Sequence, residues 1–127
     1  MFRIDNQSRQ AVYEQIVEQI EKYILSGILT DGDQLPSVRK LSVQLTVNPN
    51  TVQRAYTELE RSGVIVTAPG RGAFVCEAGI IALKTTRRAQ HLLALEKLVL
   101  ELNQSNVEKQ EILEVVNGIY QGGKTHD

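Results

Sequence analysis

Only three residues, Thr46 to Asn48, separate two amphipathic stretches in the middle of the chain. The first stretch begins after Ser37, a residue type that caps helices well, and its apolar spacing predicts a helix of two turns. The second is expected over about Pro49–Ser62, because Asn48 can cap it and proline suits the first helical position, where no N–H donor is needed. Helices joined by so short a link must cross steeply, so the spacing predicts a helix-turn-helix.

The flanking segments predict one more helix and a β-hairpin. Before the motif, an amphipathic helix is expected over about residues 9–26, ended by Gly27 in the left-handed conformation. After the motif, Val64–Thr67 and Ala73–Cys76 read as short strands on either side of a turn at Pro69–Gly72. Arg71 gives the tip of this expected hairpin, or wing, a positive charge.

From about Glu77 the chain becomes rich in leucine and poor in proline, which indicates a domain boundary. We expect residues 1–77 to form one domain and residues 78–127 a two-helix tail, with Ser105 and Glu108 as the capping-box pair of its second helix. Two helices with so much apolar surface cannot cover each other completely, so a second copy is the simplest partner. The expected dimer core consists of Leu92, Leu95, Val99, Leu102, Ile112 and Val116. The predicted fold class is therefore α+β, a winged helix-turn-helix followed by a short all-α two-helix dimerisation tail.

Charge is unevenly distributed along the chain, although the net charge is only −1 at pH 7. Residues 34–76 carry a net charge of +3, residues 1–33 carry −3 and residues 77–127 carry −1. The positive segment coincides with the predicted helix-turn-helix and wing, which is typical of a nucleic-acid-binding protein. The alternative is a chance excess on a solvated surface.

Composition argues against a membrane protein and favours the cytoplasm. No apolar run approaches the roughly 20 residues that a membrane span requires, and the N-terminus lacks a signal-peptide pattern. Cys76 is the only cysteine, so no intrachain disulfide can form and a reducing compartment is the simplest one.

The second helix of the motif is expected to turn a row of polar side chains towards solvent. Asn50, Thr51, Gln53 and Arg54 lie on the face opposite its apolar stripe. In a major groove, Asn and Gln can pair with adenine, Arg can pair with guanine, and a Thr methyl can contact thymine. The alternative is a helix surface that is merely solvated.

Two further parts of the chain, the start of the first motif helix and the tip of the hairpin, suit DNA. Ser37 and Arg39 begin the preceding helix, where free N–H groups and the helix dipole favour a phosphate. Arg39 could instead pair with Glu58 or Glu60. Arg71 lies between two glycines, where little bulk obstructs its approach to a minor groove; the alternative is an ordinary soluble turn residue.

The sequence offers little chemistry for an enzyme. His91 and His126 are the only histidines, and Cys76 lies far from both in the sequence. It contains neither a phosphate-binding glycine loop nor a metal-ligand spacing. We therefore expect no catalytic residue, no metal and no cofactor.

Three ordered motifs, Leu35–Leu41, Val47–Tyr56 and Gly70–Val75, resemble the winged helix-turn-helix of GntR-family bacterial transcription regulators. The Asn-Pro-Asn-Thr-Val turn and the short tail resemble the YtrA-type branch of that family. The resemblance implies a homodimer whose recognition helices enter successive major grooves of a palindromic double-stranded DNA operator while its wings reach the minor groove. It also implies repression of an operon for a membrane-transport ATPase. The DNA-binding residues that it implies are Arg39, Asn48, Asn50, Thr51, Gln53 and Arg54, with Arg71 and Gly72 in the wing.

The leading hypothesis is therefore a dimeric, sequence-specific DNA-binding repressor. The alternative is a winged-helix protein-interaction module without DNA binding, which the slightly negative net charge and the apolar tail favour. The tail leaves little room within one subunit for an ordinary ligand pocket of roughly 300–1,000 Å³. The identity of any effector therefore stays open.

Overall fold

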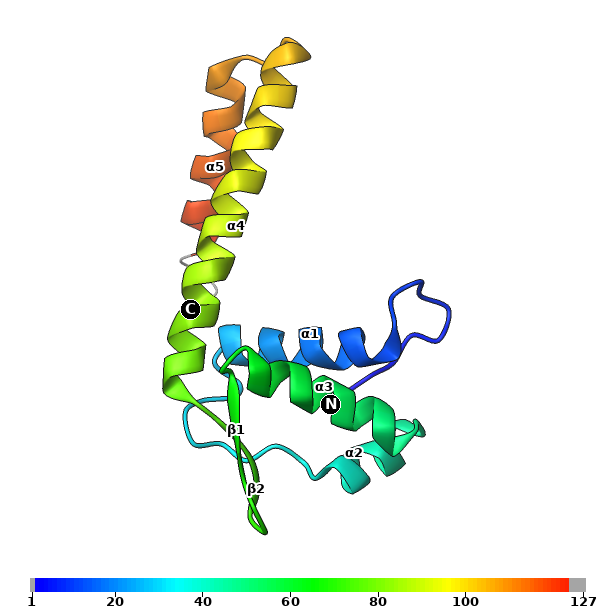
Figure 1. Cartoon of the computed structure of the whole chain (residues 1–127). Helices are drawn as coiled ribbons and strands as arrows, with labels where there is room; N and C mark the ends of the chain where they lie inside the picture. Colours follow the sequence, from blue (N-terminus) through cyan, green and yellow to red (C-terminus); the bar gives the residue numbers. More distant parts are fainter. Residues whose placement is uncertain (1, 124–127) are drawn as a thin grey trace. The chain divides into compact units, whose positions relative to one another are not determined.

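Five helices and one two-stranded sheet follow one another along residues 2–123, the part of the chain that the computed structural model describes (Figure 1). Their bounds are α1 Val12–Leu25, α2 Val38–Leu45, α3 Pro49–Arg61, β1 Ile65–Ala68, β2 Gly72–Val75, α4 Glu77–Gln104 and α5 Lys109–Gly123. The chain forms two compact units, which divide inside α4 between Arg87 and Arg88. The predicted α+β fold class, a winged helix-turn-helix followed by two helices, is confirmed.

The first helix begins later than the sequence predicts. α1 starts at Val12 rather than near residue 9, and Glu14 accepts a hydrogen bond from the Ala11 N–H at 3.3 Å. The turn before it is held by buried Gln15, whose side chain accepts from Asp5 N at 2.8 Å and donates to Asp5 O at 3.0 Å. These two hydrogen bonds stabilise a non-helical turn before α1. The periodicity of apolar residues could not predict this turn, because polar side chains hold it.

Both helices of the helix-turn-helix begin at the caps that the sequence indicates. Ser37 Oγ accepts from Lys40 N at 3.0 Å at the start of α2, and Asn48 Oδ1 accepts from Asn50 N at 2.8 Å at the start of α3. Thr46 ends α2 in the left-handed conformation (φ 56°), which helps the chain to turn within a short link. α3 then packs on α1 and α2 through its buried stripe, which consists of Val52, Ala55, Tyr56 and Leu59.

The wing is the expected antiparallel hairpin of β1 and β2. Pro69 and Gly70 (φ 75°) occupy the central positions of a type II turn, which is closed by the Arg71 N–H donating to Ala68 O at 2.9 Å. Residues 32–35 run along the outer side of β2 and extend its hydrogen bonding. The backbone bonds of this segment are Gly32 N to Val75 O (2.9 Å), Val75 N to Asp33 O (2.8 Å) and Leu35 N to Ala73 O (2.9 Å).

The first turns of α4 belong to the first compact unit. Asp31 Oδ1 accepts a hydrogen bond from the Glu77 N–H at 2.9 Å where the helix begins, and Arg87 pairs with Glu21 of α1 at 2.7 Å. The change in composition near residue 77 therefore marks the start of a helix. The compact unit itself continues past the domain division expected at residue 77 and ends at Arg87.

Gly79 packs closely against the turn between α3 and β1. A Cβ on Gly79 would lie 2.0 Å from Gly63 O and 2.5 Å from Val64 Cα, both backbone atoms. Leu83, one helical turn further on, is buried in the same core. Glycine at residue 79 thus allows α4 to rest directly on this turn.

The second compact unit consists of the rest of α4 and α5, which are joined by residues 105–108. Ser105 Oγ donates to Glu101 O at 3.1 Å, and Asn106 takes the left-handed conformation (φ 63°) before α5 begins at Lys109. The predicted capping-box role of Ser105 is therefore wrong, because its hydroxyl bonds to the end of α4. No helix within residues 2–123 is long and apolar enough to cross a membrane.

Candidate nucleic-acid interface

The polar side chains predicted on α3 lie on its outer side but face two different neighbours. Asn50, Gln53 and Arg54 are exposed, and Thr51 is half-buried. Gln53 lines a hollow between α3 and the wing, and its Nε2 donates to Thr57 Oγ1 at 3.3 Å. Asn50, Thr51 and Arg54 line a second hollow against the start of α1. Gln53 therefore borders the wing side of α3, although it lies only one helical turn from Asn50 on the same helix.

Arg54 stacks on an aromatic ring of α1. Its guanidinium carbon lies 3.8 Å from the centroid of the Tyr13 ring, which is a cation–π contact. Stacking restrains the long side chain, while the N–H groups at the edge of the planar guanidinium can still donate to a phosphate or a base. Sequence reasoning missed Tyr13 because its place on the apolar stripe of α1 resembles that of a core residue.

The start of α2 holds the two residues that the sequence predicts for a phosphate contact. Ser37 is exposed and its oxygen caps the helix, and Arg39 is exposed one residue into α2. The alternative pairing of Arg39 with an α3 carboxylate is not seen within residues 2–123. Glu58 pairs instead with Arg61 at 3.1 Å, and Glu60 accepts hydrogen bonds from Thr67 of β1. The Arg39 guanidinium is thus not neutralised by either carboxylate.

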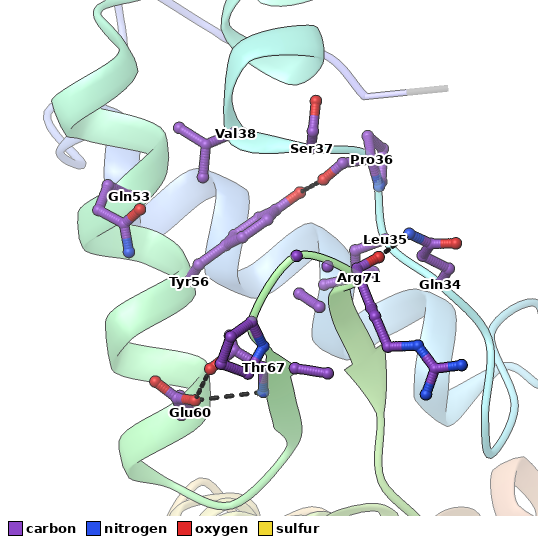
Figure 2. Close-up of a pocket in the computed structure, with 15 residues that line it drawn as sticks. Gln34, Leu35, Pro36, Ser37, Val38, Gln53, Tyr56, Glu60, Thr67 and Arg71 are labelled. Atoms are coloured by element: carbon purple, nitrogen blue, oxygen red, sulfur yellow. Dashed lines mark hydrogen bonds between the residues drawn. The ribbon is translucent and has the colours of Figure 1, made fainter.

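A hollow of about 480 Å³ separates α3 from the wing (Figure 2). Gln53, Tyr56 and Glu60 line it from α3, and Thr67 and Arg71 line it from the hairpin. The Glu60 carboxylate accepts from both the backbone N–H (3.3 Å) and the hydroxyl of Thr67, so β1 is tied to α3 at the floor of this hollow. These hydrogen bonds satisfy an acceptor oxygen of the carboxylate but leave its negative charge in place.

Tyr56 ties α3 to the segment that precedes α2. Its hydroxyl donates to Pro36 O at 2.6 Å, and the residue is only 3% exposed (Figure 2). Burial raises the pKa of the Tyr56 phenol well above its ordinary value, because the charged phenolate would lose its hydration. The hydroxyl therefore stays protonated and ties α3 to the segment that leads into α2.

The wing tip carries Arg71 and Gly72, both exposed. The Arg71 side chain extends away from Tyr56 in Figure 2, and its carbonyl accepts a hydrogen bond from Gln34 Nε2 at 2.8 Å. Gln34 was not among the predicted site residues. No local pattern could have indicated it, because the contact joins positions 37 residues apart.

A capped two-helix motif, an exposed polar recognition helix and a hairpin with an arginine at its tip define a DNA-binding protein of the winged helix-turn-helix class. Residues 12–75 match the model of a family described as bacterial regulatory proteins, gntR family. The chain belongs to the GntR family of bacterial regulatory proteins.

Known relatives agree with this membership. The HTH-type transcriptional repressor YtrA of Bacillus subtilis (strain 168) is 38% identical over 130 residues, which cover 100% of both proteins. The crystal structure of a transcriptional regulator from Oenococcus oeni shares 36% identity with a TM-score of 0.77, covering 92% of this chain and 97% of that one. The AraR DNA-binding domain in complex with operator ORE1 shares 25% identity with a TM-score of 0.52, over 57% and 89% of the two chains.

These relatives are regulators of transcription rather than enzymes, which confirms the expectation that this chain is not an enzyme. They also decide between the two hypotheses drawn from the sequence. The protein is a DNA-binding transcriptional regulator. The alternative hypothesis, an interaction module that does not bind DNA, is therefore rejected.

Proposed function

We propose that the protein is a homodimeric repressor that acts on bacterial DNA in the cytoplasm and binds a palindromic operator. In each half-site, α3 enters the major groove, the start of α2 holds a phosphate, and the wing tip reaches the minor groove. The resemblance to the YtrA-type branch extends the proposal to an operon for a membrane-transport ATPase.

The observation that supports this proposal is that the residues proposed for three kinds of DNA contact all lie in one compact unit. Within residues 2–123, neither Arg39 nor Arg71 takes part in an ion pair with a carboxylate. Two exposed guanidinium groups that the protein does not neutralise are well suited to phosphate oxygens. The proposed contact residues are Ser37, Arg39, Asn48, Asn50, Thr51, Gln53, Arg54, Arg71 and Gly72.

The second compact unit supports the proposal of a dimer. Leu92 and Leu95 are 51% and 50% exposed, and Val116 is 37% exposed. The remaining members of the expected dimer core, Val99, Leu102 and Ile112, are half-buried. Apolar surface of this extent on two short helices is typical of a protein interface, and a second copy would align two recognition helices on a palindrome.

The test is operator binding across a range of salt concentrations. The duplex is obtained by selecting bound sequences from random DNA with the full-length protein. Arg39→Ala and Arg71→Ala should each weaken binding by about 1–3 kcal/mol and lower the salt slope by roughly one for each phosphate that the variant no longer neutralises.

Arg61→Ala is the matched control, because Arg61 is exposed but already paired with Glu58. This variant makes the same change in net charge and should bind nearly as the parent protein does. Equal salt slopes for all three variants would overturn the residue assignment, and selection of a motif without two-fold symmetry would overturn the palindromic operator.

A further inference from the structure

The wing-tip arginine is held through both of the peptide groups that flank its Cα atom. Its own N–H donates to Ala68 O at 2.9 Å and closes the turn. Its carbonyl oxygen accepts from Gln34 Nε2 at 2.8 Å (Figure 2). Fixing both peptide planes fixes φ and ψ of Arg71, and therefore the direction of its Cα–Cβ bond. The side chain thus leaves the turn in a set direction.

Gln34 is placed for this contact by its backbone. The residue forms an isolated antiparallel bridge with Phe74 of β2. The residues on either side of it, Asp33 and Leu35, bond to the backbone of β2. The segment therefore behaves as a short third strand beside the wing, and the Gln34 side chain extends from it to the tip.

Gly72 provides the space that the Gln34 amide occupies. Gly72 has a φ of 121°, and a Cβ built on it would lie 2.6 Å from Gln34 Nε2. A larger residue at position 72 would therefore displace the amide as well as strain the backbone. This packing gives a reason for glycine at the wing tip that does not depend on a contact with DNA.

We propose that Gln34 is a positioning residue for DNA binding. Its side-chain amide holds the Arg71 carbonyl and so presents the Arg71 guanidinium to the DNA in one orientation. The proposal rests on the proposed contact between Arg71 and the operator. Without the amide, the turn stays closed by the hydrogen bond to Ala68 O and Gly72 stays paired with Ala68, but the Arg71 carbonyl loses its hydrogen bond. The peptide between Arg71 and Gly72 is then held less firmly, and DNA binding must order it.

The first arm of the test needs no DNA. Gln34→Met keeps the length of the side chain and removes the amide, and Gln7→Met makes the same change at an exposed glutamine whose side chain forms none of the hydrogen bonds found within residues 2–123. Backbone ¹⁵N relaxation of the full-length protein should show the order parameters of Arg71 and Gly72 falling from about 0.85 to below about 0.6 only in Gln34→Met. Unchanged order at both residues overturns the proposal.

The second arm measures affinity for the selected duplex in a double-mutant cycle. Arg71→Ala should weaken binding roughly tenfold and Gln34→Met roughly threefold, and Gln34→Met should cause no further weakening when Arg71 is already alanine. A threefold weakening that persists in the Arg71→Ala background overturns the proposal, because Gln34 then acts by its own contact with DNA or by general stability.

The two levels of the proposal fail in different ways. If Arg71→Ala binds as the parent protein does, the contact assigned to Arg71 is wrong, and the role of Gln34 in binding falls with it. If Arg71→Ala binds more weakly while Gln34→Met does not, only the role of Gln34 is overturned.

Discussion

The Tyr56 hydroxyl makes a pH-dependent contribution to the stability of the DNA-binding unit. Burial raises the pKa of this phenol in the folded protein above its unfolded value of about 10. Its contribution is therefore complete below pH 10 and is lost at higher pH, because the unfolded chain ionises first. At pH 11 the loss is on the order of 1 kcal/mol.

We predict that Tyr56→Phe removes this alkaline loss. The variant also lacks the hydrogen bond to Pro36, so it should be about 1 kcal/mol less stable at pH 7, with the difference shrinking or reversing near pH 11. Urea unfolding at fixed protein concentration from pH 7 to 11 measures both effects. A difference between the two proteins that does not change with pH would contradict the prediction.

Single residues also show where sequence reasoning reaches its limit. Asn48 and Ser37 could be assigned as caps because a cap bonds within its own helical turn. Gln15 and Gln34 could not, because each bonds to a segment that the fold brings to it. Sequence reasoning therefore identifies residues whose role depends on their own helical turn. It does not identify residues such as Gln34, which hold a distant segment in place.

At the scale of elements, the start of α4 depends on one glycine. Gly79→Ala would place a methyl group against the backbone of Gly63 and Val64, where no flexible side chain can give way. We expect the free energy of unfolding to fall by about 2–3 kcal/mol, because overpacking of this kind forces the backbone to shift. Thermal or urea unfolding of the purified variant measures the loss.

Gly118→Ala is the matched control for that change. Gly118 also lies inside a helix, α5, and a Cβ there meets nothing within 4 Å. The same substitution should therefore raise stability by roughly 0.5–1 kcal/mol, the ordinary helix-propensity gain. Equal changes in the free energy of unfolding for the two variants would show that the close packing of Gly79 does not affect stability.

The order and type of the elements were predictable because each has a local signal. Pro49 and the short link indicate the helix-turn-helix, and the Pro-Gly turn indicates the wing. The packing of Gly79 was not predictable, because a glycine near a change in composition looks the same whether it lies in a linker or in a close contact.

At the scale of the whole molecule, the proposed dimer makes a direct prediction. Leu92→Asp combined with Leu95→Asp places two charges on exposed positions of the second unit, so this unit should still fold but lose its apolar interface. Sedimentation equilibrium should then show a monomer, and operator binding should weaken by more than tenfold because two half-sites are no longer linked.

Val43→Asp is the control for this change. Val43 is 74% exposed, apolar and located on α2 in the first unit. This variant should sediment as the parent protein does. A dimer that persists in the Leu92 and Leu95 variant would refute the proposed interface.

The sharing of α4 between the two compact units bears on how tails can be exchanged among proteins of this family. A junction at residue 77 would separate Gly79 and Leu83 from the core that they complete, whereas a junction after Arg87 would leave that core intact. A chain that ends at Glu77 should therefore melt about 10 °C below one that ends at Arg87, since burial of Leu83 alone contributes about 2 kcal/mol. Recombination after Arg87 would join the DNA-binding unit to a different C-terminal tail and leave the fold of that unit complete.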